Sequence, residues 1–113
     1  MPKNMHPLVW FMLLRIKKSG GVEPIGCIAF YCNDPNGLFA FVSMIAVKSE
    51  FQKRGIGNCL INAAENIVKE KGLSFFRLEV RKENQTALHF YKKHDWYIVG
   101  ERQNIYLMEK HIL

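Results

Sequence analysis

Apolar and β-branched residues occur in three long runs in the first half of the chain. The runs span residues 8–16, 25–32 and 38–47, and the segments that separate them are rich in Gly, Asn, Ser and Pro. Segments of that composition are typical of tight turns. The pattern therefore predicts three antiparallel strands in a meander. Because the runs are apolar without strict alternation, we also expect helices on both faces of the sheet.

A helical period begins after the third run and spans residues 55–71. Apolar side chains recur there with the spacing of one helix face: Ile56, Cys59, Leu60, Ala63, Ala64, Ile67 and Val68. Polar side chains occupy the remaining positions, with Glu65 and Lys69 one turn apart, and Gly72 is a typical helix stop. We predict an amphipathic helix that packs its apolar face on the sheet.

The second half of the chain continues with a strand over 74–80, a shorter helix over 85–94 and a closing hairpin of strands 97–101 and 105–109. A strand followed by a long helix and another strand implies a parallel pair. The predicted fold class is therefore α/β (α+β), with a mixed, mostly antiparallel central sheet and flanking helices.

Length and composition further limit the kind of protein that this chain can be. A chain of 113 residues holds one domain, and 49% hydrophobic with 23% charged residues is ordinary globular usage. The apolar run over 8–14 is much shorter than the ~20 residues of a membrane helix and is not followed by a signal-peptide cleavage site. We therefore expect a single domain over residues 1–113, located in the cytoplasm and without a membrane partner.

The chain carries 16 Lys and Arg against 10 Asp and Glu, a formal net charge of +6. This charge favours polyanionic partners, either nucleic acid or a phosphate-rich cofactor. Residues 37–42 (G-L-F-A-F-V) have a superficial likeness to an RNA-binding motif, but the inserted Leu38 and the missing basic residue break it. We expect no nucleic-acid partner.

Cysteine and histidine positions give no sign of a metal site or a disulfide framework. Cys27, Cys32 and Cys59 form no CxxC pair, and their odd count argues against a disulfide framework. We expect all three to be reduced and mostly in the core. The four histidines, His6, His89, His94 and His111, lack ligand spacing, so surface or packing roles are predicted for them.

The chemically informative segment is Q-K-R-G-I-G at residues 52–57, where the long helix is predicted to begin. Two glycines let the backbone approach a ligand, and the unpaired N–H groups and dipole of a helix start favour an anion. Lys53 and Arg54 add positive charge. The alternative is a tight connection with incidental basic residues. Neither a P-loop nor the complete Rossmann glycine pattern is present.

Taken together, these segments resemble the GNAT superfamily of N-acetyltransferases. The Q/R-x-x-G-x-G/A signature is matched at residues 52–57, preceded by the strand end at 45–47. The likeness continues through residues 78–81, Asn84, Ala87 and residues 90–91. The resemblance covers about residues 38–97 and is greatest to the ribosomal-protein-alanine N-acetyltransferase type. It implies a GNAT-like acyl-CoA N-acyltransferase fold in which two parallel strands splay apart.

The resemblance also implies acetyl-CoA as acetyl donor, bound where the strands splay and at the start of the long helix. Val47 N–H would donate to the thioester oxygen, and Asn84 would hold the pantetheine amides, cap the second helix, or both. The implied cofactor-binding residues are Ile45, Ala46, Val47, Gln52, Lys53, Arg54, Gly55, Ile56, Gly57, Asn58, Asn84, Ala87 and Tyr91.

For catalysis the resemblance implies that Tyr91 is the general acid for the leaving thiolate; helical spacing alone would place it in the core instead. Glu79 is the candidate base, with an ion pair to Arg77 or Arg81 as the alternative. The implied function is acetyl transfer to a primary amine by direct attack, with a lean toward an α-amine such as a peptide N-terminus, because α-amines lose their proton more readily than lysine. The alternative is a catalytically inactive CoA-binding or regulatory domain of the same fold.

Two departures from the family pattern bear on this expectation. Family members usually begin with another strand and two helices that form the acceptor wall, whereas the first apolar run here starts at residue 8. We expect that wall to be missing, in a fragment or a naturally short member, or to come from a partner subunit, and we allow for a homodimer. Asp95 also stands where a Gly is common, and it tolerates the left-handed backbone such a turn needs.

Overall fold

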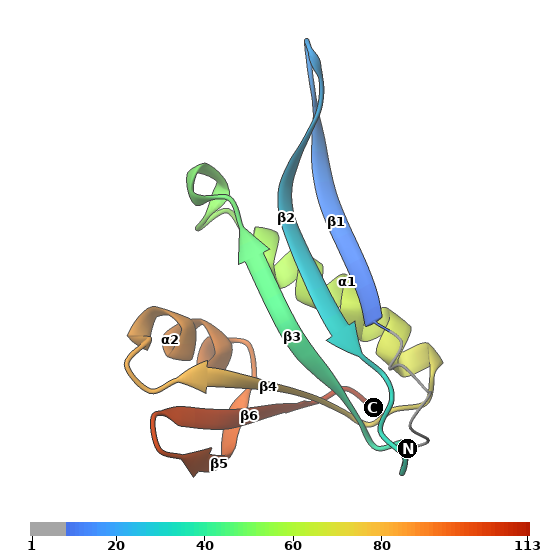
Figure 1. Cartoon of the computed structure of the whole chain (residues 1–113), viewed down its shortest axis with the longest axis vertical. Helices are drawn as coiled ribbons and strands as arrows, with labels where there is room; N and C mark the ends of the chain where they lie inside the picture. Colours follow the sequence, from blue (N-terminus) through green and yellow to red (C-terminus); the bar gives the residue numbers. More distant parts are fainter. Residues whose placement is uncertain (1–8) are drawn as a thin grey trace.

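The computed structural model describes residues 9–113; His6 lies outside them (Figure 1). Its elements, in chain order, are β1 (Val9–Lys18), β2 (Gly21–Tyr31), β3 (Phe39–Val47), the 3₁₀ helix η1 (Ser49–Phe51), α1 (Ile56–Glu70), β4 (Phe75–Arg81), α2 (Gln85–Lys93), β5 (Tyr97–Arg102) and β6 (Ile105–His111). Every strand and helix predicted from the sequence is present, with boundaries that differ by at most four residues.

The strands form one mixed sheet with the order β1-β2-β3-β4-β6-β5. Among the described strands, β3 and β4 are the parallel pair, and the helical crossover through α1 connects them as predicted. In the closing hairpin, β6 pairs with β4, and β5 pairs with the other edge of β6. The mixed, mostly antiparallel sheet predicted from the sequence is confirmed.

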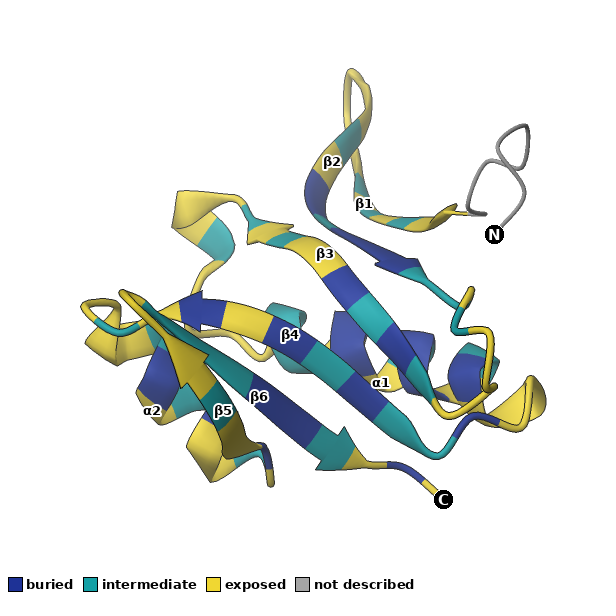
Figure 2. Cartoon of the chain, turned by 60° about the horizontal axis from the view of Figure 1, so that its bottom comes forward, coloured by how far each residue is buried: buried dark blue, intermediate teal, exposed yellow. Residues whose placement is uncertain are grey.

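Both helices pack on the same face of the sheet (Figure 2). Phe30, Phe76 and Met108 are fully buried beneath them, together with Leu60 of α1 and Leu88 of α2. The prediction of coverage on both faces was wrong, because two helices supply a single layer. The other face of β1 leaves apolar side chains in solvent within the described structure: Val9, Phe11 and Leu13 are 49%, 57% and 41% exposed.

The buried face of α1 is rotated relative to the predicted one. Cys59 is exposed, whereas Ile61 and Glu65, which the periodicity did not assign to the core, are buried. Lys110 of β6 meets this face of the helix, and its Nζ lies 2.7 Å from Glu65 Oε1. Glu65 therefore pairs with this lysine across the core rather than with Lys69 along the helix.

The prediction of mostly core cysteines was also wrong. The three thiols are free, as expected, but Cys27 and Cys32 are half-buried and Cys59 is exposed. Cys59 is exposed because the same rotation of α1 turns it away from the sheet.

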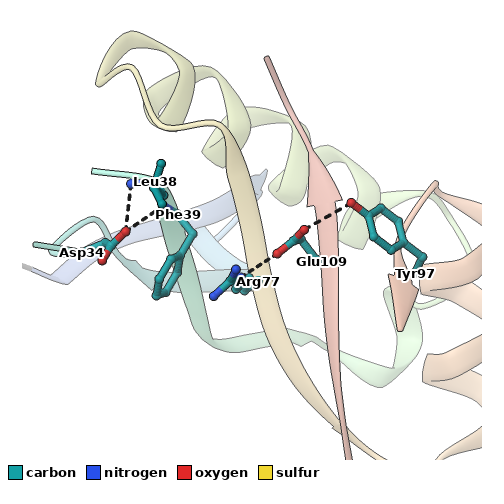
Figure 3. Close-up of polar contacts among 6 residues, drawn as sticks. All are labelled: Asp34, Leu38, Phe39, Arg77, Tyr97 and Glu109. Atoms are coloured by element: carbon teal, nitrogen blue, oxygen red, sulfur yellow. Dashed lines mark hydrogen bonds and ion pairs between the residues drawn. The ribbon is translucent and has the colours of Figure 1, made fainter. Parts of the chain in front are cut away.

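A polar network ties the strands together on the face opposite the helices (Figure 3). Arg77 Nε of β4 donates to Glu109 Oε2 of β6 at 2.7 Å, and the Tyr97 hydroxyl of β5 donates to the other carboxylate oxygen at 3.2 Å. The Arg77 guanidinium also lies 4.2 Å from the centroid of the Phe39 ring on β3. The buried Glu109 carboxylate thus links β4, β5 and β6, and Arg77 extends the network to β3.

A bulge at Ser43 separates β3 from β4. The register of β2 with β3 passes from Phe30–Val42 to Ala29–Met44, which leaves Ser43 as the extra residue. A bulge bends the strand that carries it. The parallel pairing of β3 with β4 accordingly ends after Phe41–Arg77, and the two strands diverge beyond it (Figure 1). The splay predicted from the family resemblance is confirmed.

Within residues 9–113, neither α1 nor α2 combines the length and the apolar character that crossing a bilayer requires.

Candidate active site

A cleft of about 380 Å³ opens where β3 and β4 diverge. The structure gathers eleven of the thirteen predicted cofactor-binding residues around it: Ile45, Ala46, Val47, Gln52, Lys53, Gly55, Ile56, Gly57, Asn84, Ala87 and Tyr91. Arg54 and Asn58 are not in its lining. Phe51, Thr86 and Phe90 line it as well, and sequence reasoning did not assign them to the site. Phe90 could have been found, because it precedes Tyr91 in the matched motif.

One wall of the cleft is the free backbone edge of β3. Lys48 N–H donates to Ile25 O of β2 at 2.8 Å. Because successive residues of a strand direct their N–H groups to opposite edges, the Val47 N–H faces away from β2 and toward the cleft. The strand thus offers a backbone donor at the position that the resemblance implied.

Another wall is the first turn of α1. Gly55 adopts a left-handed conformation with φ of 80° at the N-cap, and the first intrahelical bond runs from Cys59 N to Gly55 O. The N–H groups of Ile56, Gly57 and Asn58 therefore have no acceptor within the helix, and no side chain caps them. Because the first turn also carries no acidic residue, the helix dipole is unopposed, and the cleft can receive an anion there.

The loop before α1 is held by two side-chain contacts. Gln52 Nε2 donates to the carbonyl oxygen of Val47 at 3.1 Å, so this side chain fastens the loop to the end of β3. The Arg54 guanidinium lies 5.3 Å from the centroid of the Phe51 ring. Lys53, with a positive φ of 63°, lines the cleft. Lys53 and Arg54 thus give two positive charges to the loop that leads directly into α1.

Gly26 allows α1 to approach the sheet closely at the cleft, and sequence reasoning did not single it out. A Cβ at this position would lie 3.1 Å from Ala46 O, 3.2 Å from Leu60 Cδ1 and 3.3 Å from Ile56 Cγ2. The glycine in β2 therefore fixes the position of the helix start. A lone Gly inside an apolar strand run was the available sequence signal.

Asn84 is the N-cap of α2. Its Oδ1 accepts a hydrogen bond from Ala87 N at 3.1 Å, which agrees with the capping role predicted as one of its two functions. The cap also places Ala87 in the cleft wall, facing β3 across the opening. Asn84 itself lines the cleft, so the same side chain stabilises the helix start and borders the site.

Tyr91 lies between the cleft and the core. It is 8% exposed, and its ring packs edge-on against Trp96 at a centroid distance of 5.5 Å. Burial raises the pKa of the Tyr91 hydroxyl above its ordinary value near 10. The hydroxyl is therefore protonated at neutral pH, as a proton donor must be. Tyr91 thus packs in the core, as helical spacing alone predicted, and also lines the cleft.

The turn that follows α2 holds Tyr91 in place. The N–H groups of His94 and Trp96 both donate to Tyr91 O at 3.0 Å. Asp95 between them has a φ of 70°, so the predicted left-handed turn is confirmed at this residue.

A second hollow of about 350 Å³ lies between the same two strands and shares Ile45, Asn84, Ala87 and Tyr91 with the cleft. Its lining adds Ser43 and Glu79. Glu79 is on the strand face predicted for it, but its carboxylate contacts the Arg102 guanidinium of β5. The predicted alternative partners are engaged elsewhere, Arg77 with Glu109 and Arg81 with Glu83. Arg102 was missed because no local pattern links it to Glu79.

No group of three or more His, Cys, Asp and Glu side chains suited to a metal ion occurs in the part of the chain that the structure describes. His94 Nδ1 lies 2.8 Å from Phe90 O, and the His111 ring packs on Phe75 at 4.4 Å. Both histidines have the packing roles predicted for them.

Comparison with known proteins agrees with the family resemblance seen in the sequence. The model of the acetyltransferase (GNAT) family matches residues 3–96. A putative ribosomal protein bS18-alanine N-acetyltransferase of Bacillus subtilis (strain 168) is 33% identical over 90 residues, which are 75% of this chain and 57% of the relative. The chain spans about a third to just over half the length of the curated relatives it matches.

Solved structures share the fold. PaiA N-acetyltransferase from Thermoplasma acidophilum, crystallised in complex with coenzyme A, superposes with a TM-score of 0.75 at 26% identity over 89% of this chain and 60% of that one. Ard1 from Thermoplasma volcanium gives a TM-score of 0.71 at 28% identity over 84% and 66% of the two chains.

Proposed function

Because this chain belongs to the acetyltransferase (GNAT) family, we propose that it transfers an acetyl group from acetyl-CoA to a primary amine. The observation that carries the proposal is the meeting of three features in one cleft: the open edge of β3, the uncapped start of α1 and the buried, protonated Tyr91. Each feature suits a different part of the donor. The family relationship and the coenzyme A complex of PaiA support the choice of donor.

The residues of the cleft fit the donor in order along its length. The N–H groups of Ile56, Gly57 and Asn58, with Lys53 and Arg54 nearby, would hold the pyrophosphate. The backbone edge over 45–47 would pair with the pantetheine arm, as a strand neighbour would, and Asn84 and Ala87 would border that arm. Gln52, tied to Val47 O, acts by positioning the loop.

Acetyl-CoA supplies an activated acetyl thioester, and the groups of the chain act on either side of it. Val47 N–H would donate to the thioester oxygen as it gains negative charge. Tyr91 would give its proton to the departing sulfur, and Glu79 would receive a proton from the attacking amine. The described residues that line the two hollows include no cysteine, which favours direct attack by the amine over an acyl-cysteine intermediate.

An α-amine, such as a peptide N-terminus, is the proposed acceptor class. Attack requires the neutral amine, and an α-amine with a pKa near 8 releases its proton at neutral pH far more readily than lysine near 10.4. The ribosomal-protein-alanine relative is consistent with this choice.

Two measurements test the proposal. Calorimetric titration with acetyl-CoA, against desulfo-CoA and ATP, separates recognition of the whole donor from general attraction of polyanions. Release of free CoA thiol in the presence of peptide amines then measures transfer. Saturable, CoA-selective binding with amine-dependent release supports the proposal, and binding without release with any amine selects the inactive CoA-binding domain instead.

We also propose that the chain is located in the cytoplasm and that it forms a homodimer. The homodimer is supported by the exposed apolar side chains of β1, since exposed apolar patches are typical of protein interfaces. Sedimentation equilibrium over a range of concentrations would measure the association, and a monomer at every concentration would contradict it.

A further inference from the structure

A small hollow of about 210 Å³ lies where β4 ends and the β5–β6 hairpin turns. Arg81, Arg102, Gln103, Asn104 and Ile105 line it. Its charged lining consists of two guanidinium groups, and no carboxylate belongs to the lining. Guanidinium groups bind carboxylates through paired N–H donors. The lining therefore has the chemistry of an anion site.

This arginine hollow is adjacent to the proposed acceptor side of the active site. Arg81 also lines the 350 Å³ hollow that contains Glu79 and Tyr91. Arg102 also lines a third hollow, of about 250 Å³, in which Glu79 takes part. A molecule whose amine reaches Glu79 would therefore lie next to the guanidinium groups of Arg81 and Arg102, which are in the walls of the adjoining hollows.

Both arginines retain free donor capacity. Arg102 contacts Glu79 through Nη2, and Arg81 contacts Glu83 through Nη1 at 3.4 Å. Each guanidinium has five N–H donors, so these contacts use a minority of them within the described structure. The two side chains are 65% and 76% exposed, which leaves them open to a ligand from solvent.

The wall that carries Arg102 is held in position by the loop after β4. Lys82 N donates to Asn104 O at 2.7 Å, and Lys82 Nζ lies 2.9 Å from Glu101 Oε2. Gln103, with a φ of 45°, makes the tight turn between β5 and β6. The hollow is therefore built on a hairpin that is anchored at both sides of its tip.

We propose that the acceptor carries an anionic group close to its reactive amine, and that Arg81 and Arg102 bind this group. This inference rests on the proposed acetyl transfer and names its acceptor class. The ammonium of an incoming acceptor would take the place of Arg102 on Glu79, and the anion of the same molecule would take the place of Glu79 on Arg102. The exchange conserves charge pairing on both sides, which a polycationic acceptor cannot do.

The test measures binding to the CoA-loaded protein, so it does not depend on turnover. Calorimetry at low ionic strength compares Ala-Glu amide with its neutral match Ala-Gln amide. Ala-Gln with a free C-terminus distinguishes a side-chain carboxylate from a terminal one. We expect Ala-Glu amide to bind about tenfold more tightly than Ala-Gln amide. Each exposed charge pair adds only a small amount to the free energy of binding, and the two amounts add up. Added salt should reduce the ratio.

Arg81→Gln and Arg102→Gln should each reduce that ratio about threefold, and Arg102→Lys should retain part of it. Lys17→Gln, which removes the same charge at the distant β1–β2 hairpin, should leave it unchanged. Equal affinity for the two amides, no binding of Ala-Glu amide, or a preference insensitive to both arginine variants would overturn the inference. Release of CoA thiol with amines that carry no further charged group, measured separately, would show that the proposed acetyl transfer holds even when the inference about the acceptor is wrong.

Discussion

The ring of Tyr91 on α2 packs edge-on against Trp96 with 5.5 Å between the centroids, and the Trp96 N–H donates to the Tyr91 carbonyl oxygen at 3.0 Å. Side chain and backbone of the same tyrosine are thus held by one tryptophan. The buried tyrosine held in this way lines both the 380 Å³ cleft and the neighbouring 350 Å³ hollow. The arrangement predicts that the hydroxyl can be removed without disturbing the fold.

Tyr91→Phe should lower kcat about 100-fold, because a positioned proton donor contributes on that order to the expulsion of a leaving group. The affinity for CoA should be unchanged, since the ring and its packing remain. Thiol-release kinetics and calorimetric titration measure the two quantities. Equal losses in kcat and CoA affinity would reject the acid role.

The pH profile of the proposed acetyl transfer by the wild-type chain should extend far into the alkaline range. Burial raises the pKa of Tyr91, and the proposed acid role requires its protonated form, so the rate should fall only above the ordinary tyrosine pKa near 10. The rise on the acid side should follow deprotonation of the acceptor amine. A fall of kcat/KM well below pH 10 that Tyr91→Phe abolishes would contradict the assignment.

Arg54→Glu should weaken CoA binding about tenfold by reversing a charge beside the uncapped start of α1. Lys69→Glu makes the same reversal in the last turn of the same helix, far from the exposed N–H groups. It controls for the change in net charge. Similar affinities of the two variants would count against a phosphate site at the helix start.

Gly26→Val should destabilise the fold by about 1–3 kcal/mol, because its Cβ would meet the Ala46 carbonyl oxygen and the start of α1. Relief of the clash by displacing the helix would also weaken CoA binding. Gly20→Val in the β1–β2 turn is the control, since no atom lies within 4 Å of a Cβ there. Urea unfolding and titration measure both effects, and wild-type stability of the Gly26 variant would refute the close approach.

Lys110→Met should cost about 3 kcal/mol of unfolding free energy, because Glu65 is left buried without its partner. Adding Glu65→Leu should recover most of the loss, since apolar pairs replace buried ion pairs well. Urea denaturation of both single variants and the double variant measures the coupling. Independent, additive effects would show that the two side chains do not interact.

Several features of this chain were predictable because their causes are local. The helical spacing from Ile56 to Val68 set α1, the turn residues separated the first three strands, and Asn84 capped α2 through a hydrogen bond three residues along the chain. The loop over 52–57 could be predicted as a candidate anion site from its glycines and its place before a helix. The signals that decide these features lie within a few residues of one another.

Tertiary structure alone decided how distant segments meet. β6 lies between β4 and β5, which brings Lys110 to Glu65 and Glu109 to Arg77, and the β5–β6 hairpin brings Arg102 to Glu79. No period or spacing in the sequence encodes such pairs, because strand order is set by the packing of the whole sheet. The sequence thus determined the elements and the position of the proposed cofactor loop, whereas the sheet decided which charges face one another on the proposed acceptor side.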